Sequence, residues 1–539
     1  MWYININNRR INLTYLFLLV FVIFGFYLRF YHLNFPSIGY HNMKENEYLD
    51  PGYNFLQEGN FLHKTAFAFY GLDEGLGYHE EYGQVPMVSY IIFGLWKIFG
   101  INLWMPRLVM ILFMMGSIVT IYFIIKQLSN SEYLSLLSSF LLSFMPLGIY
   151  FGRNIQPESP ALFFILIGTL FYLKWTDTLS FKHAFLALLL IGIAGCFKST
   201  FLIIGIPLLF IFPYSKILVM FKEDKRKFIN TTLYSILGLL PFAILTLLFE
   251  LTLVDKAKKN MDLEPWRVLG FEYWSSRLPA LKSYIADNYT WWFFYFAVIG
   301  LIFALLKYKT KFSRFVIGYS FAFIPYAMLI SSKLGGHSYY QMPFLPLICI
   351  LSAYFLYTCG IFIKQISKIK VLQFVPLLIL LLTISSVSAA NNRVWDTNFY
   401  GQDVVGDYLK ETDTSPKLIA FTHSQGMAVC SYARKGCGGV ANSSELMHKE
   451  EVFDINSIYI DMSSFNELQN NKELFEYISS NYKIDLAGLI KQGDQFMPLH
   501  LLLKKGGKFN MSDIQNKMPV LKKTYDITRG NVDYYWVKN

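Results

Sequence analysis

Residues 104–125 read WMPRLVMILFMMGSIVTIYFII, an apolar run of the length that crosses a bilayer. A spanning helix needs roughly 20 apolar residues, each adding about 1.5 Å of rise. Comparable runs follow one another from residue 12 to residue 390, and the chain is 54% apolar, 18% aromatic and only 16% charged. This composition is typical of an integral membrane protein and excludes a large soluble protein.

Basic residues orient the predicted spans. Arg9 and Arg10 precede the first apolar run at 13–30, which lacks a small-residue cleavage site and so predicts an uncleaved span with a cytoplasmic N-terminus. Three later basic loops then fall on the cytoplasmic side, at residues 216–227, 307–314 and 364–370. These loops account for the net charge of +11, so we expect membrane lipids and no nucleic acid as partners. The threading predicts a polytopic α-helical protein of the plasma or inner membrane with about eleven transmembrane helices.

Two apolar runs depart from the simple pattern. Residues 86–99 are too few to span, which favours an interfacial helix. Residues 183–213 are too many for one span and contain Lys198 near the middle. Because a lysine inside the bilayer costs on the order of 3 kcal/mol, we predict two short spans with Lys198 at their outer tip.

The C-terminal residues 391–539 have the composition of a soluble domain. Short apolar strands at 418–421, 458–460 and 501–503 alternate with a helical pattern around 467–478, which predicts a small α/β domain. The threading makes this domain extracytoplasmic, where Cys430 and Cys437 could form a disulfide.

We therefore expect a transmembrane catalytic domain at 1–390 and a soluble domain at 391–539. The first domain includes an extracytoplasmic first loop at 34–100 with amphipathic helices. Acidic, histidine and aromatic residues gather in the gaps on that same side of the membrane, at Glu45, Glu47, Glu80, Glu81, Glu158 and 337–340. Carboxylates at helix ends on one face predict a membrane-embedded active site open to that face.

Residues 40–59 read YHNMKENEYLDPGYNFLQEG. This segment resembles the first loop of the polyprenol-dependent glycosyltransferases of the GT-C superfamily, which includes protein O-mannosyltransferases and the bacterial enzymes that attach aminoarabinose to lipid A. The resemblance identifies Glu47 as the acid of that loop. It continues in order through Pro86 and Arg107, RNIQPE at 153–158, Phe197 with Lys198, and HSYYQMPFLP at 337–346.

The resemblance implies a GT-C-like fold and an inverting glycosyltransferase. Such an enzyme moves a monosaccharide from a polyprenyl-phosphate-linked donor to an acceptor hydroxyl of a glycan, lipid or protein on the extracytoplasmic side. Glu47 would be the general base, and Glu158 would orient the acceptor or tune Glu47. Substrate-binding candidates, with the cations facing the donor phosphate, are Lys198, Arg107, His337, Tyr339, Tyr340 and Glu81.

The chain departs from the family pattern at two places. Glu47 and Glu158 are glutamates where aspartate is commoner. A later acidic position of the family aligns with Gln84, which leaves Glu80 or Glu81 as displaced candidates. No cofactor is predicted, although Glu47, Glu158 and His337 could bind a divalent ion.

Structural interpretations compete at each position. Glu47 could cap a surface helix, Glu158 could face a helix dipole, and Lys198 could extend to the interface. Arg107 could anchor its helix end, and residues 337–340 could belong to an aromatic belt. Two alternative functions stay open: a lipid or sugar transporter, which would need mid-bilayer charges and two similar halves, and a non-catalytic polyprenyl-phosphate-binding protein.

Overall fold

The structure, a computed structural model, describes residues 3–6, 9–61, 66–69, 72, 85–250, 270–422 and 426–539. The chain forms two compact units. The first comprises Met1–Leu33, Gly83–Met87 and Trp104–Asn391, and the second comprises Asn34–Tyr82, Val88–Leu103 and Asn392–Asn539. By packing, most of the first loop groups with the C-terminal residues, whereas the functional division expected at residue 390 stays a prediction.

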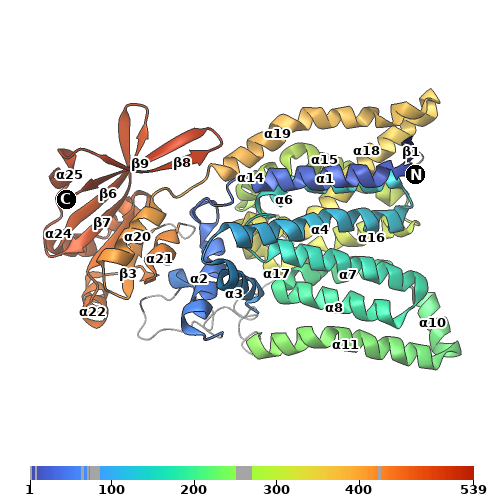
Figure 1. Cartoon of the computed structure of the whole chain (residues 1–539), viewed down its shortest axis with the longest axis horizontal. Coiled ribbons are helices and arrows are strands. Elements are labelled where there is room, and N and C mark those ends of the chain that lie inside the picture. Colours follow the sequence, from blue (N-terminus) through green and yellow to red (C-terminus); the bar gives the residue numbers. More distant parts are fainter. Residues whose placement is uncertain are drawn as a thin grey trace. The chain divides into compact units, whose positions relative to one another are not determined.

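The first unit is a bundle of apolar helices, which run alongside one another in Figure 1. A two-stranded hairpin, β1 (Tyr3–Ile6) and β2 (Arg9–Asn12), precedes the first helix. The helices are α1 (Leu13–Phe30), α4 (Trp104–Ser129), α5 (Glu132–Phe144), α6 (Pro146–Tyr150), α7 (Glu158–Thr178), α8 (Phe181–Phe197), α9 (Gly205–Phe210), α10 (Tyr214–Glu223), α11 (Lys225–Glu250), α13 (Phe271–Ser275), α14 (Leu278–Asn288), α15 (Thr290–Leu306), α16 (Lys311–Phe321), α17 (Phe323–Gly336), α18 (Leu345–Ser367) and α19 (Leu378–Trp395), with 3-10 turns η2 (Ser199–Ile204), η4 (Ser338–Phe344) and η5 (Lys370–Leu377).

The described helices confirm an integral membrane protein. Seven are long and apolar enough to cross a bilayer, or nine if each of two bent pairs makes one span. The bent pairs are Ser199–Phe210 with Tyr214–Glu223, at 75°, and Leu278–Asn288 with Thr290–Leu306, at 94°. Two predicted spans correspond to the shorter apolar helices Glu132–Phe144 and Phe181–Phe197, so the number eleven stays a prediction.

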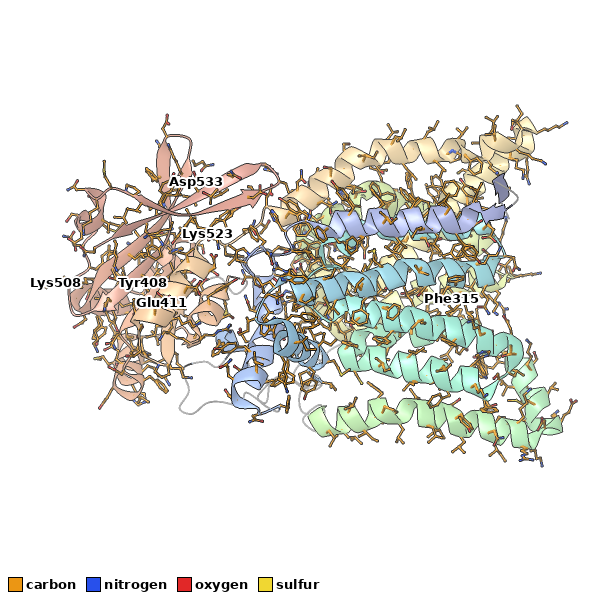
Figure 2. The ribbon with its side chains drawn as sticks, viewed as in Figure 1. Phe315, Tyr408, Glu411, Lys508, Lys523 and Asp533 are labelled. Carbon is orange, nitrogen blue, oxygen red and sulfur yellow. A yellow bond between two sulfur atoms is a disulfide. The ribbon has the colours of Figure 1, made fainter. Side chains whose placement is uncertain are left out.

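Helices in the first unit approach one another closely at glycines. A Cβ at Gly300 of α15 would lie 2.1 Å from the carbonyl oxygen of Leu351 in α18. Small residues permit such contacts, and packing of this kind stabilises helices where surrounding lipid offers no hydrophobic driving force. Phe315 of α16, labelled in Figure 2, is only 2% exposed within the bundle.

Within the second unit, the loop residues form α2 (Asn42–Glu58), η1 (Phe67–Phe69) and α3 (Met87–Phe99), the last at the predicted interfacial segment. Gly52 lets α2 approach α3, because a Cβ there would lie 2.8 Å from Ile92 Cγ2. Ser89 Oγ donates a hydrogen bond to the carbonyl oxygen of Tyr48 across the same contact, at 2.9 Å. The two helices therefore form one packed pair.

The C-terminal residues form a seven-stranded sheet in the order β4-β3-β5-β7-β6-β9-β8, with parallel pairs among the first three strands and antiparallel pairs elsewhere. The three predicted strands fall within β3, β5 and β7, so the prediction of a helix-and-sheet domain is confirmed. The elements are α20 (Gln402–Thr412), β3 (Lys417–Phe421), α21 (Ala428–Ala433), β4 (Gly436–Gly438), α22 (Ser443–Phe453), β5 (Ser457–Asp461), α23 (Met462–Asn470), α24 (Lys472–Asn481), β6 (Tyr482–Gln492), β7 (Gln495–Lys505), α25 (Ser512–Gln515), β8 (Val520–Ile527) and β9 (Gly530–Lys538).

Candidate functional site

A buried ion pair joins two breaks in the helices of the first unit. Lys198 lies between α8 and η2 with extended backbone, at the break where the sequence predicted the tip of a helical hairpin. Its Nζ is paired with Oε1 of Glu158, the first residue of α7. The two side chains are only 6% and 1% exposed. Burying two charges costs several kcal/mol per ion before their mutual attraction is counted. Stabilisation of the fold is therefore a weak explanation for the presence of this pair.

Two aromatic rings complete the surroundings of Lys198. Its Nζ lies 4.5 Å from the ring centroids of both Tyr339 and Tyr340, within the range of cation–π attraction. The ring of His337 stacks on Tyr339, with centroids 5.3 Å apart. The structure therefore brings five predicted residues of the first unit together, and we call Glu158, Lys198, His337, Tyr339 and Tyr340 the lysine cluster.

The segment that carries the two tyrosines is held by side chains from other helices. Tyr326 Oη donates to the carbonyl oxygen of Tyr340 at 2.6 Å, and Tyr289 Oη donates to that of Gln341 at 2.9 Å. Asn288 Nδ2 donates to the carbonyl oxygen of Ser338 at 3.1 Å. These bonds fix the η4 backbone, which makes the orientation of its aromatic rings a property of the fold.

Several buried polar atoms lie in the loop before α7 and on its first residue. Glu158 Oε2, Asn154 Oδ1 and Gln156 Nε2 are buried and have no hydrogen-bond partner among the described residues. An unsatisfied buried polar group costs about 1–3 kcal/mol, and such groups recur where a ligand or an ion supplies the missing bond. Glu158 was predicted from the sequence and the two amides were not, although both belong to the RNIQPE segment.

Arg107 contacts backbone carbonyl groups near the end of α1. Its Nη1 donates to the carbonyl oxygens of Leu33 at 2.9 Å and of His32 at 3.3 Å. Arg153 Nη1 likewise donates to Tyr31 and His32, at 2.8 and 2.6 Å. The two guanidinium groups thus bind the chain just beyond α1. This is the anchoring role weighed for Arg107, and its phosphate-binding role stays a prediction.

Glu47 belongs to the second unit, on the first turns of α2. Its carboxylate is paired with Lys44, one turn earlier, and the Glu47 side chain is 8% exposed. Neighbouring bonds fix this end of the helix: Ser37 Oγ donates to Glu45 at 2.8 Å, and Asn46 Nδ2 donates to the Ser37 carbonyl oxygen at 3.0 Å. Glu47 therefore sits on an ordered helix end and not on an unstructured loop.

The predictions for the displaced acidic position and for a metal ion are not part of the lysine cluster. Glu80, Glu81 and Gln84 lie outside the described residues. In the part of the chain that the structure describes, no three His, Cys, Asp or Glu side chains are grouped so that they could hold a metal ion.

Residues 83–255 match the family described as dolichyl-phosphate-mannose-protein mannosyltransferase. No curated protein sequence matches the chain significantly. Among solved structures, the Archaeoglobus fulgidus oligosaccharyltransferase AglB with an inhibitory peptide and a dolichol-phosphate is similar, with a TM-score of 0.59, 10% identity and coverage of 90% of this chain and 74% of that one. ArnT from Cupriavidus metallidurans in the apo state has a TM-score of 0.52, 11% identity and coverage of 91% and 97%. ArnT bound to undecaprenyl phosphate has a TM-score of 0.50 at 11% identity.

The TM-scores show a shared fold, and identities of 10–11% support nothing finer. Together with the family match, they confirm the resemblance to the GT-C superfamily that the motifs from Glu47 to Pro346 predicted.

Proposed function

We propose that the chain is a membrane glycosyltransferase that moves a monosaccharide from a polyprenyl-phosphate-linked donor to an acceptor hydroxyl, with inversion at the anomeric carbon. The observation that carries this proposal is the lysine cluster, where a buried cation is held between a carboxylate and two aromatic rings. The family match to dolichyl-phosphate-mannose-dependent transferases supports the donor class. So do two similar structures, which contain a dolichol-phosphate and undecaprenyl phosphate.

The chemistry needs a cation where negative charge develops. As the sugar leaves, the bond from its anomeric carbon to the phosphate oxygen breaks, and the electron pair stays on the phosphate. A preorganised positive group in a site shielded from water stabilises that charge without reorganising. Lys198 is such a group, because Glu158 and the rings of Tyr339 and Tyr340 fix its Nζ.

The remaining roles follow from the types of side chain. Glu47 takes the proton from the acceptor hydroxyl as general base, and the acceptor oxygen attacks the anomeric carbon directly, which inverts it. The unpartnered acceptor Glu158 Oε2 and the amides of Asn154 and Gln156 supply hydrogen bonds to substrate hydroxyls. Arg107 and His337 contribute to the electrostatic stabilisation of the phosphate.

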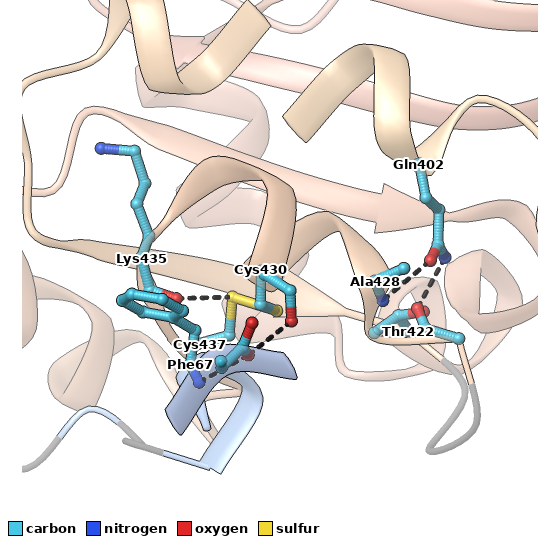
Figure 3. The surroundings of a disulfide bond; sticks show 10 residues. Phe67, Gln402, Thr422, Ala428, Cys430, Lys435 and Cys437 are labelled. Atoms are coloured by element: carbon cyan, nitrogen blue, oxygen red, sulfur yellow. Dashed lines mark hydrogen bonds between the residues drawn. A yellow bond between two sulfur atoms is a disulfide. The ribbon is translucent and has the colours of Figure 1, made fainter. Parts of the chain in front are cut away.

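The extracytoplasmic placement of the reaction has two supports. The basic loops orient the N-terminus toward the cytoplasm. In the C-terminal domain, Cys430 and Cys437 form a disulfide (Figure 3), a bond that persists in oxidising compartments.

A transfer assay in detergent tests the proposal. Purified protein receives a panel of radiolabelled polyprenyl-phosphate monosaccharides with glycan, lipid and hydroxyl-bearing peptide acceptors. Transfer from one donor with an inverted product linkage is the expected result. Donor binding without turnover would favour a non-catalytic binding protein. If the protein neither binds nor turns over any donor but moves a labelled lipid across vesicles, it is a transporter.

An apolar cavity in the first unit offers a place for the donor's isoprenoid chain. Its volume is about 550 Å³, and its walls come from α13, α14, α15, α16, α17, η4 and α18. Gln341 and Phe344 contribute to the wall and belong to η4, the segment that carries Tyr339 and Tyr340. A lipid tail here would be joined to a phosphate near the lysine cluster through a short stretch of chain.

Filling this cavity is expected to weaken donor binding. Val298 lines the cavity from α15 and is 45% exposed, so V298W adds bulk without disturbing a packed core. We expect KM for the lipid-linked donor to rise about tenfold with kcat nearly unchanged, since the change removes ground-state and transition-state binding equally. The matched control is L305W, because Leu305 lies two turns along the same helix face, is 50% exposed and is not part of the cavity wall. Equal KM values for both variants and wild type would place the lipid tail elsewhere.

A further inference from the structure

Another carboxylate on α2 is bound by the C-terminal domain. Asp50 follows Glu47 by one turn and is 1% exposed. Its Oδ2 accepts hydrogen bonds from Ser431 Oγ at 2.7 Å and from the backbone N–H of Phe67 at 3.0 Å. Its Oδ1 lies 3.5 Å from Nη1 of Arg434. One carboxylate thus ties α2 to η1 and to a segment 381 residues further along the chain.

Arg434 contacts the same helix through a second side chain. Its guanidinium lies 3.7 Å from the ring centroid of Tyr53 in α2 and 5.6 Å from that of Phe67 in η1. Arg434 follows the last residue of α21 and adopts a left-handed backbone, with φ of 56°. For a residue with a side chain this conformation is uncommon and persists where surrounding contacts fix it.

A disulfide closes the loop that carries two of the three partners of Asp50. Cys430 and Cys437 are bonded, and Ser431 and Arg434 lie between them. Cys437 belongs to β4, which pairs with β3 through Leu418, so the loop is joined covalently to the sheet. Figure 3 shows the disulfide beside Phe67. Within the loop, Lys435 Nζ donates to the carbonyl oxygen of Asp413 at 2.7 Å.

We infer that this disulfide-closed loop, residues 430–437, is a clamp that positions the helix carrying the general base. Asp50, Ser431 and Arg434 are positioning residues: they touch no substrate and act by fixing α2, and through it the carboxylate of Glu47. The inference rests on the proposed role of Glu47. A base displaced by about 1 Å can lose two orders of magnitude in rate, so a fixed helix is a functional requirement.

Two changes release the clamp in different ways. The double variant C430S/C437S opens the loop and changes none of the residues that contact Asp50. The variant R434M removes the cation and keeps the disulfide. Burial raises the pKa of Asp50 to about 6 in spite of Arg434, so without that cation the carboxyl can take up a proton near neutral pH, and the variant is expected to fold.

The control is an ion pair of the same unit that does not contact α2. Lys523 Nζ, labelled in Figure 2, lies 2.5 Å from Oδ2 of the buried Asp403 in α20. The variant K523M therefore removes a comparable cation from the C-terminal domain. It should leave the clamp intact.

Hydrogen exchange of the full chain in detergent gives the first readout. We expect amides of residues 42–58 to exchange about tenfold faster in C430S/C437S and in R434M, and at the wild-type rate in K523M. R434K should recover most of the protection. Unchanged exchange over 42–58 in both releasing variants would overturn the clamp.

Kinetics give the second readout and separate the two proposals. Both releasing variants should lower kcat about tenfold and leave KM for the lipid-linked donor unchanged, since the base is displaced while donor binding is not. A faster-exchanging α2 with unchanged kcat would overturn the positioning role. If the wild type transfers no sugar, the proposed function fails, and the exchange experiment still decides whether the clamp exists.

Discussion

Replacing Glu47 with glutamine is expected to lower the rate of sugar transfer by about 10²–10⁴-fold, the usual contribution of a general base. Glutamine keeps the size of the side chain and can still form hydrogen bonds, but it is neutral and cannot accept the proton. Because the loss concerns the chemical step, kcat should fall and KM for the lipid-linked donor should change little. The measurement is steady-state transfer with the purified variant and the donor chosen from the panel.

The ion pair of Glu47 provides a matched control. E47Q also breaks the contact with Lys44, so a loss of activity could arise from a loosened helix end. K44M breaks the same ion pair and leaves the carboxylate in place. We expect K44M to retain transfer within a few-fold of wild type, because the carboxylate that accepts the proton stays in place. Equal losses of transfer activity in E47Q and K44M would show that Glu47 acts only by stabilising the helix end through its ion pair.

Hydropathy predicted the helices well where a span is a simple apolar run. The apolar run at 290–306 coincides with α15, and the predicted break at Lys198 is present between α8 and η2. Hydropathy alone does not divide the apolar run at 134–150, in which α5 ends at Phe144 and α6 begins at Pro146. Proline lacks the N–H that would continue the helix and is favoured at a helix start, so Pro146 was the available signal.

The candidate site could be predicted only in part, because charge is visible in a sequence and pairing is not. Glu158 and Lys198 were both placed at outer helix ends, but their contact depends on how α7 and α8 pack. Asn154 and Gln156 carry no charge and follow no spacing rule, and only their burial marks them. Asp50 lies within the segment that carries the family resemblance, yet Ser431 is 381 residues away and no local pattern predicts that bond.

Changes in the lysine cluster are expected to lower both stability and the rate of sugar transfer. A double variant separates the catalytic role of the Lys198–Glu158 ion pair from its contribution to stability. Removing one member of a buried ion pair leaves the other charge unpaired, at a cost of about 3–5 kcal/mol, so K198M or E158Q alone should lower the midpoint of thermal unfolding. Activity lost in such variants is uninformative by itself. Replacing both charges removes the unpaired one, and similar replacements elsewhere are neutral or stabilising.

We therefore expect K198M/E158Q to unfold near the wild-type temperature and yet to transfer sugar about 10²–10³-fold more slowly, because the cation that stabilises the departing phosphate is gone. Its binding of undecaprenyl phosphate, measured by calorimetry in detergent, should weaken in parallel.

An active double variant with wild-type stability would reduce the pair to a packing feature between α7 and α8. Loss of stability in the double variant equal to that in the single variants would mean that the tyrosine rings and the neighbouring backbone need Lys198 in place. K198R then decides between packing and catalysis, since it keeps the charge over Tyr339 and Tyr340 and should retain measurable transfer if that charge stabilises the phosphate.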